Sequence, residues 1–136
     1  MKIATAITLD ANAKYASLGG AIKNGYMMYF DWLQNHKGGV TIKNKTYMVE
    51  LILIDDSSSK TSVATITDHL IASEGVKFFL APYSSGLTRV ASPKVHDAGA
   101  LLIAAGSSST SVYANRPTVF GTLTPASQVA VFRHFR

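Results

Sequence analysis

Hydrophobic residues along this chain fall into two alternating patterns. Short apolar runs of strand length occupy residues 2–9, 47–54, 76–81, 100–104 and 119–120. Between these runs, apolar residues recur three or four positions apart in segments 14–36, 63–71 and 87–95, and again after residue 125. The first pattern predicts strands and the second predicts helices. Their alternation predicts an α/β fold, a doubly wound parallel sheet with helices on both faces.

The segment at residues 14–36 carries the longest helical pattern. Its main apolar stripe is formed by Tyr15, Leu18, Ile22, Tyr26, Tyr29 and Leu33. Because Met27, Phe30 and Trp32 widen this stripe, we expect the helix to be buried on more than one side. Gly38 and Gly39 predict its end.

Turn and cap residues predict the other boundaries. Residues 43–45 predict a turn before the second strand, and Ser57–Ser59 are N-cap candidates for the second helix. Residues 107–117 have no regular pattern. Pro125 is placed to occupy the first turn of a last helix, with Thr124 as its N-cap, and this helix is predicted to continue to the end of the chain.

Two adjacent acidic residues, Asp55 and Asp56, follow the second predicted strand. They could form a metal or phosphoacceptor site, or they could end the strand and cap the second helix. A phosphoacceptor domain of the receiver type also needs an aspartate at the end of a later strand. Here the third strand is followed by Tyr83, Ser84 and Ser85, so the structural interpretation is favoured.

Composition narrows the functional classes. The chain has 136 residues, 47% of them hydrophobic, which is enough for one globular domain. It has no cysteine, which excludes disulfides, thiolate nucleophiles and cysteine metal ligands. The net charge is +5, but the thirteen Lys and Arg residues are scattered from Lys2 to Arg136. Nucleic-acid binding is therefore not expected, since it requires a concentrated basic face.

The ends of the chain and the length of its apolar runs bear on the cellular location of the protein. No apolar run approaches the ~20 residues needed to cross a bilayer. Residues 1–5 begin a strand and lack the apolar core of a signal peptide. If the protein is exported, we expect its leader to be absent from this sequence. Because the pattern stops within a predicted helix, we also expect the chain to be part of a larger protein.

Two serine clusters carry the strongest functional signal. The third predicted strand is followed by Tyr83, Ser84 and Ser85, and the fourth by residues 107–109, all serine. We expect these strands to be neighbours, and ligands of parallel sheets bind beyond the carboxyl ends of the strands. Hydroxyl groups both donate and accept hydrogen bonds, so two such loops suit the carboxylate and the ammonium group of a zwitterion. The clusters therefore predict a polar small-molecule site.

Each of these residues also has a structural interpretation. Ser84 or Ser85 could cap the following helix and leave the other serine free to bind a ligand at the positive end of that helix. Residues 107–109 could form a solvated loop. Tyr15, at the start of the first helix, and Tyr83 are expected near the same rim, where they could either pack or line a pocket.

Motifs for catalysis or metal binding are absent from the sequence. It contains no GxSxG and no GxGxxG motif. Residues 20–25 have the glycine spacing of a P-loop, but Tyr26 stands where a lysine is required. The histidines show no metal-ligand spacing; they are His36, His69, His96 and His134. Serines without a placed base are inert as nucleophiles, so we expect a protein that is not an enzyme, with no metal and no cofactor.

Four stretches carry a resemblance to a known family. The first is the predicted helix with Tyr15…Leu18-Gly19…Gly25, ending in Gly38-Gly39, and the second is Ile54-Asp55-Asp56. The third runs from Val76 to Ser85 and ends in Ala81-Pro82-Tyr83-Ser84-Ser85. The fourth runs from Ala100 to Ser108 and ends in Ala105-Gly106-Ser107-Ser108. In order and spacing they resemble the N-terminal lobe of type I periplasmic solute-binding proteins, the Leu/Ile/Val-binding family of ABC transporters. The resemblance covers nearly the whole chain.

The resemblance implies particular binding residues. In that family, the serine after the third strand and the small or hydroxyl residues after the fourth hold the carboxylate and ammonium groups of an amino acid. On this chain the implied ligand-binding residues are Ser85, Ser107 and Ser108, with Tyr83 and Ser84 beside them.

The resemblance also implies a two-lobed protein that closes around its ligand, with residues 1–136 forming part of the N-terminal lobe. The implied function is extracytoplasmic binding of a small polar solute such as an amino acid, in the periplasm or outside the cell, with a transporter permease as partner. Related lobes also form ectodomains of amino-acid-sensing receptors, whose partner would be a signalling module. A small α/β enzyme is a third alternative, and it would need a base beside one of the serines.

Overall fold

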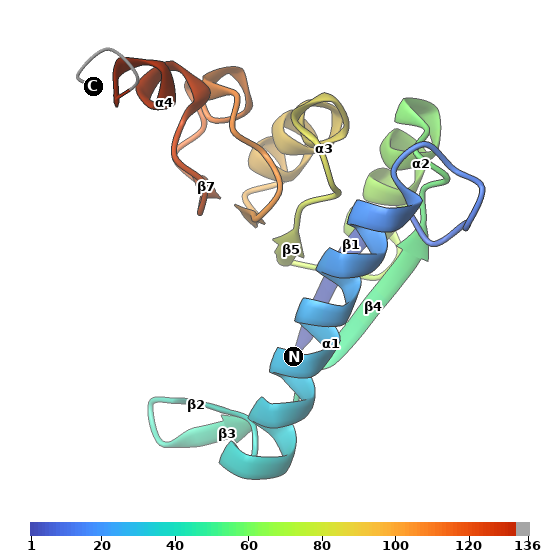
Figure 1. Cartoon of the computed structure of the whole chain (residues 1–136). Helices are drawn as coiled ribbons and strands as arrows, with labels where there is room; N and C mark the ends of the chain where they lie inside the picture. The colour runs from blue at the N-terminus through green and yellow to red at the C-terminus, as the bar shows by residue number, and fades with distance from the viewer. Residues whose placement is uncertain (133–136) are drawn as a thin grey trace.

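The computed structural model describes residues 1–132. Its strands are β1 (Lys2–Ile7), β2 (Val40–Ile42), β3 (Lys45–Tyr47), β4 (Glu50–Asp55), β5 (Phe78–Leu80), β6 (Leu101–Ala104) and β7 (Val119–Gly121). Its helices are α1 (Ala16–Lys37), α2 (Lys60–Ala72), α3 (Ser85–Asp97), the short 3₁₀ helix η1 (Thr110–Val112) and α4 (Ala126–Phe132). Figure 1 shows how these elements are arranged.

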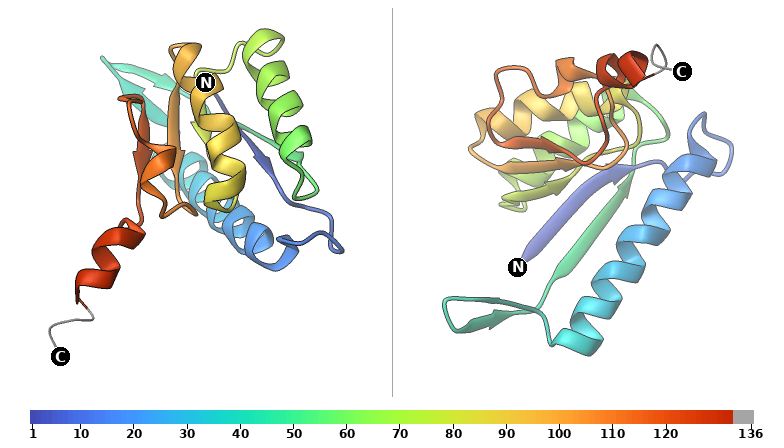
Figure 2. Two further views of the ribbon diagram at one scale, coloured as in Figure 1. Left: turned by 90° about the horizontal axis from the view of Figure 1, so that it is seen from above. Right: turned by 60° about the vertical axis from the view of Figure 1, so that its left-hand side comes forward.

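Five parallel strands form the central sheet, in the order β4-β1-β5-β6-β7. From β1 the chain first passes outward to β4, then returns across β1 to β5 and continues to β6 and β7. This change of direction places α1 on one face of the sheet and α2 and α3 on the other (Figure 2). The predicted doubly wound α/β fold is therefore confirmed, and so is the predicted pairing of the third and fourth strands, which are β5 and β6.

The face of the sheet beneath α2 and α3 holds the main hydrophobic core. Side chains alternate between the two faces along each strand. Ala4 of β1, Phe79 of β5 and Leu102 of β6 all point to this face and are buried. Leu70 and Val95 cover them from α2 and α3. This layer fixes the helices, and so it also fixes where α3 begins at the carboxyl edge of the sheet.

The prediction that the first helix is buried on more than one side is wrong. Within α1 only Gly19 and Phe30 are buried. Met27, Met28 and Trp32 are 50%, 73% and 43% exposed, respectively. The physical reason is that α1 packs against the sheet along one line of residues that includes Phe30, so other apolar residues stay exposed, among them Leu18 (49%) and Tyr29 (53%) of the predicted stripe.

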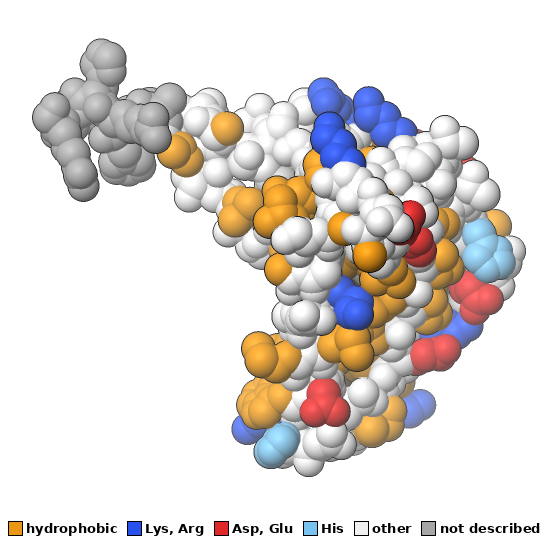
Figure 3. All heavy atoms as spheres, turned by 45° about the vertical axis from the view of Figure 1, so that its right-hand side comes forward, with side chains coloured by type: hydrophobic (Ala, Val, Ile, Leu, Met, Phe, Trp, Pro, Cys, Tyr) orange, Lys and Arg blue, Asp and Glu red, His pale blue; other side chains and the backbone are white. Residues whose placement is uncertain are grey.

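The sheet face on the α1 side is covered only in part. Phe78, Ile103 and Phe120 point to this face from β5, β6 and β7, and they are 41%, 37% and 52% exposed. In the space-filling view, hydrophobic side chains also reach the surface (Figure 3). Both faces of the strands are apolar in sequence, but only the α2–α3 face is fully packed within the described residues.

A hairpin precedes β4 where the sequence predicted a turn and one continuous strand. β2 and β3 pair antiparallel, and Lys43 and Asn44 form the turn with φ values of 47° and 62°. The turn prediction is therefore confirmed, and the single strand at 47–54 is corrected to β3 and β4. Asn tolerates this left-handed backbone better than most residues, which favours a tight turn here.

The last helix begins one residue later than predicted. The carbonyl of Pro125 accepts hydrogen bonds from the amides of Gln128 and Val129, so Pro125 occupies the N-cap position that was predicted for Thr124. The predicted continuation of this helix through residues 133–136 lies outside the described residues.

Candidate functional site

The two serine loops leave the sheet side by side. β5 and β6 are adjacent and parallel, and Leu80 lies opposite Ile103 in the register. The loops that follow therefore share the carboxyl edge of the sheet. The amide of Ser109 donates a hydrogen bond to Ser85 Oγ at 3.2 Å and joins the two loops directly. The structure thus brings the predicted serine clusters together.

Ser84 is the N-cap of α3. Its hydroxyl accepts a hydrogen bond from the amide of Leu87 at 3.3 Å. Its φ of 82° and ψ of 145° belong to a region that favours glycine, so the backbone is strained there. The first amides of a helix have no partner within it, and they carry partial positive charge. At this end of α3 the remaining amides can therefore meet an anionic group.

Ser107 is fully buried and its hydroxyl is already engaged. Ser107 Oγ donates to Thr88 Oγ1 at 2.6 Å, and Thr88 Oγ1 lies 2.8 Å from the carbonyl oxygen of Ser84. The carbonyl of Ser107 accepts a hydrogen bond from the Tyr113 hydroxyl. Ser107 therefore ties the second loop to α3, and its hydroxyl faces the protein interior.

Ser108 is placed differently from Ser107. It is half-buried, and no hydrogen bond joins its hydroxyl to another residue of the range 1–129, whose side chains the structure describes. Its carbonyl accepts a hydrogen bond from the amide of Ala126 at 2.9 Å, which holds the backbone of the loop. Of the two serines, Ser108 has the hydroxyl that these described residues leave available to a ligand.

Tyr15 and Tyr83 pack against each other at the same edge. Their ring centroids are 5.4 Å apart and the rings are inclined by 69°, an edge-to-face arrangement. Gly106 makes room for Tyr83 and Ile22, because a β-carbon there would lie 2.9 Å from Cδ2 of Tyr83 and 3.0 Å from Cδ1 of Ile22. Both tyrosines are half-buried, so each also presents surface beside the serine loops.

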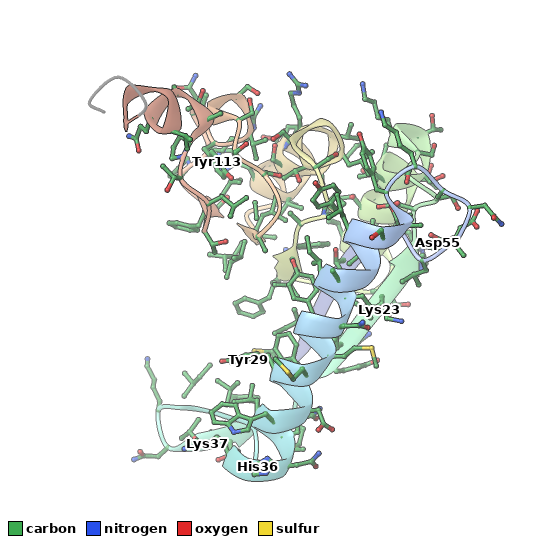
Figure 4. The ribbon with its side chains drawn as sticks, viewed as in Figure 1. Lys23, Tyr29, His36, Lys37, Asp55 and Tyr113 are labelled. Carbon is green, nitrogen blue, oxygen red and sulfur yellow. The ribbon has the colours of Figure 1, made fainter. Side chains whose placement is uncertain are left out.

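Asp55 has a role that the sequence interpretation missed. The prediction that Asp55 ends its strand is confirmed, since β4 ends there, but the prediction that it caps α2 is wrong, because Ser59 caps α2 by accepting from the amide of Ser62. Asp55 Oδ1 instead accepts hydrogen bonds from the amides of Leu9 and Ser57 at 2.8 and 2.9 Å. It lies beside the loop that leads into α1 (Figure 4). Desolvation raises the pKa of Asp55, but these hydrogen bonds outweigh it and hold the pKa below its ordinary value.

Asp56 is fully buried and does not cap α2 either. Its Oδ1 accepts from the Thr8 hydroxyl at 2.6 Å and from the amide of Ser58 at 2.8 Å. Its Oδ2 has no hydrogen-bond partner among the described residues. Burial raises the pKa of Asp56 above its ordinary value, although the two hydrogen bonds oppose this shift. The acidic pair at a strand end was the sequence signal, but the sequence did not indicate its partners Leu9 and Thr8, which lie 46 and 48 residues earlier in the chain.

The site offers hydroxyl and amide groups, and His96 does not lie close enough to act as a general base for its serines. Its ring contacts Thr118 Oγ1 at 2.9 Å, at the far end of α3 from the serines. With a rise of about 1.5 Å per residue, the 13-residue helix separates the two ends by roughly 18 Å. The arrangement can hold a polar molecule by hydrogen bonds, and His96 is too distant to activate Ser85.

Among the described residues, three other kinds of feature would bear on function: a surface hollow, metal-binding clusters and membrane-spanning helices. A hollow of about 380 Å³ opens at the amino edge of the sheet, between the β2–β3 hairpin and the starts of β1 and β5, and contains none of the predicted site residues. Within residues 1–132, no three His, Cys, Asp or Glu side chains gather as a metal site. No helix in that range is both long and apolar enough to cross a membrane.

Comparison with known proteins gives one family match. The family model described as periplasmic binding protein matches residues 2–134. A comparison with curated proteins finds no match.

Several solved structures share the fold. One is the branched-chain amino acid transporter substrate-binding protein of Streptococcus pneumoniae in complex with isoleucine, with a TM-score of 0.79, 23% identity, and 92% of this chain and 34% of that chain covered. A leucine-binding protein of Thermotoga maritima gives a TM-score of 0.80 and 20% identity, and the match covers 99% of this chain and 37% of that chain. A solute-binding protein of an ABC transporter from Rhodopseudomonas palustris, in complex with 3,4-dihydroxybenzoic acid, gives a TM-score of 0.77 and 20% identity. That match covers 94% of this chain and 33% of that chain. The chain thus spans about a third of the length of the structures it matches.

Proposed function

Because this chain belongs to the periplasmic binding protein family, we propose that it forms part of the N-terminal lobe of a protein that binds a small polar solute for an ABC transporter. The solute is bound without chemical change, outside the cytoplasm, and is handed to a permease. The observation that carries this proposal is the hydrogen bond from the Ser109 amide to Ser85 Oγ, which joins two hydroxyl-bearing loops at one edge of the sheet.

The two loops suit the two ends of an amino acid. The first amides of α3 and the Ser85 hydroxyl can donate to a carboxylate, where the positive end of the helix adds a favourable field. Hydroxyl and carbonyl oxygens of the second loop can accept from an ammonium group, and Ser108 has the free hydroxyl there. In this proposal Ser84 and Ser107 hold the loops in place, since both hydroxyls are engaged within the protein.

Tyr15 and Tyr83 form the rim of the proposed site. Aromatic rings at such an edge can pack on the apolar part of a solute and exclude water from its charged groups. In this proposal a second lobe closes over the ligand and supplies the remaining contacts. The share of the matched structures that the chain covers, about a third, supports this division.

Isothermal titration calorimetry of the full-length protein tests the proposal. The solutes are L-leucine, L-isoleucine, L-valine, L-serine, L-glutamine and 3,4-dihydroxybenzoic acid, which covers the types bound by the matched structures and two polar amino acids. We expect saturable binding of at least one amino acid. Absence of binding across the whole panel would contradict the proposal. Binding of the aromatic acid alone would keep solute binding but exclude the zwitterion.

A further inference from the structure

The loop that joins β1 to α1 is tied at both ends, to the last residue of β4 and to the loop between β4 and α2. At its start, the amide of Leu9 donates to Asp55 Oδ1 at 2.8 Å. At its end, the amide of Tyr15 donates to Ser58 Oγ at 2.9 Å. Tyr15 is the residue before α1, and its own side chain makes no capping hydrogen bond. The position of Tyr15 therefore depends on a side chain 43 residues away.

Ser58 is itself held rigidly. Its amide donates to Asp56 Oδ1 at 2.8 Å, and its hydroxyl lies 3.2 Å from that of Thr8. Asp56 is fully buried, and its amide donates to the carbonyl of Ile7 at the end of β1. The hydrogen bonds thus lead from the sheet through Asp56 to the Ser58 hydroxyl.

The conformation of Ser58 suggests that its hydroxyl is needed where it lies. Its φ is 58°, and that of Ser57 is 47°, values that are unfavourable for a residue with a β-carbon. The helix that follows does not use this hydroxyl, because Ser59 provides the cap of α2. The Ser58 hydroxyl serves the neighbouring loop instead, where it meets the Tyr15 amide.

We propose that Ser58 and Asp56 are positioning residues that hold Tyr15 against Tyr83 at the rim of the solute site. Without the Ser58 acceptor, the Tyr15 amide loses its hydrogen bond to the loop before α2, and the edge-to-face contact of the two rings, 5.4 Å between centroids, is no longer fixed. The inference rests on the proposed function in one respect, namely that this rim contacts the solute. The placement of Tyr15 is tested independently of any ligand.

The experiment compares Ser58→Ala and Ser58→Gly with the matched control Ser59→Ala in the full-length protein. Hydrogen exchange measures the protection of the Tyr15 amide. NMR of selectively labelled tyrosine detects the contact between the rings of Tyr15 and Tyr83, and calorimetry measures the affinity for L-leucine. In both Ser58 variants we expect exchange at Tyr15 to rise about five- to tenfold, as for loss of one hydrogen bond, together with loss of the ring contact and of affinity. Ser59→Ala is expected to raise exchange only at the start of α2.

Asp56→Asn and Asp56→Ala separate positioning from bulk destabilisation. Asparagine keeps an oxygen that accepts from Thr8 and Ser58, so we expect Asp56→Asn to retain the ring contact and Asp56→Ala to lose it. Ser58→Gly relieves the positive φ, which keeps the test valid even if Ser58→Ala folds poorly.

Two results would overturn the inference. One is an unchanged Tyr15 amide and ring contact in both Ser58 variants. The other is loss of the ring contact with unchanged solute affinity, which would remove the link between Tyr15 and the site. If the parent protein binds no solute on the panel, the proposed function fails, while exchange and NMR still decide whether Ser58 holds Tyr15.

Discussion

A β-carbon at Gly19 would lie only 2.7 Å from the carbonyl oxygen of Thr8. The first turn of α1 therefore approaches the end of β1 more closely than a side chain would allow. Thr8 is fully buried and donates to Asp56, so the strand cannot yield without disturbing that hydrogen bond. This contact sets where α1 begins relative to the carboxyl edge of the sheet.

Gly19→Ala is expected to destabilise the protein, and Gly20→Ala to stabilise it. At Gly19 the new methyl group meets backbone, and such overpacking costs about 1–3 kcal/mol. At Gly20 a β-carbon has nothing within 4 Å, so alanine is favoured by roughly 0.5–1 kcal/mol through its helix propensity. Urea unfolding of the two variants measures both effects. Equal effects at the two positions would contradict the close approach of Gly19 to Thr8.

Phe78 and Phe79 are adjacent in β5 but are expected to differ in their contribution to stability. Phe79 is 4% exposed and packs in the core beneath α2 and α3, so Phe79→Ala should cost about 3–5 kcal/mol. Phe78 is 41% exposed on the partly covered face, and we expect Phe78→Ala to cost less than half as much. The free energy of unfolding of each variant is the measurement. A larger loss at Phe78 would mean that the α1 side carries the main core.

Asp55 and Asp56 are predicted to affect stability in opposite directions as pH changes. The lowered pKa of Asp55 means that its ionised form stabilises the fold above the pKa it has in the unfolded chain, and that this contribution is lost as pH falls through the folded pKa. The raised pKa of Asp56 means that its protonated form favours the fold. That contribution is complete below the unfolded pKa and is lost as pH rises through the folded pKa.

Urea midpoints of Asp55→Asn and Asp56→Asn between about pH 2 and 7 measure these contributions. Relative to the parent, we expect Asp55→Asn to lose stability toward neutral pH and Asp56→Asn to gain it. Parallel pH profiles for the two variants would contradict the assignment of opposite environments to the two carboxyl groups.

Ser85→Ala is expected to weaken solute binding by about 1–3 kcal/mol if its hydroxyl meets a charged group of the ligand. Ser73→Ala is the matched control, because Ser73 is an exposed serine at the end of α2, at the opposite edge of the sheet. Calorimetry with the best solute of the panel measures both. An unchanged affinity in Ser85→Ala would mean that the Ser85 hydroxyl does not contact the solute and serves only to accept the hydrogen bond from Ser109.

The sequence by itself determined the class of fold and the two loops of the candidate site. Apolar runs alternating with helical spacing suffice for a doubly wound sheet, because right-handed crossovers leave few other arrangements. The serine clusters could be recognised because parallel neighbouring strands end at the same edge. The tight turn at Lys43 and Asn44 and the cap at Ser59 were also predictable, since local backbone chemistry decides them.

Only the tertiary structure decided which side chains within these segments are free and which are engaged. Ser107 and Ser108 are equivalent in sequence, yet Ser107 is buried against Thr88, whereas no side chain of residues 1–129 engages the hydroxyl of Ser108. The apolar residues of α1 gave no indication of their exposure, because burial depends on what packs against a helix and not on its own pattern. The same reason hid the link from Asp56 through Ser58 to Tyr15. Its hydrogen bonds join loops more than 40 residues apart, and such pairings are set by the packing of the whole sheet.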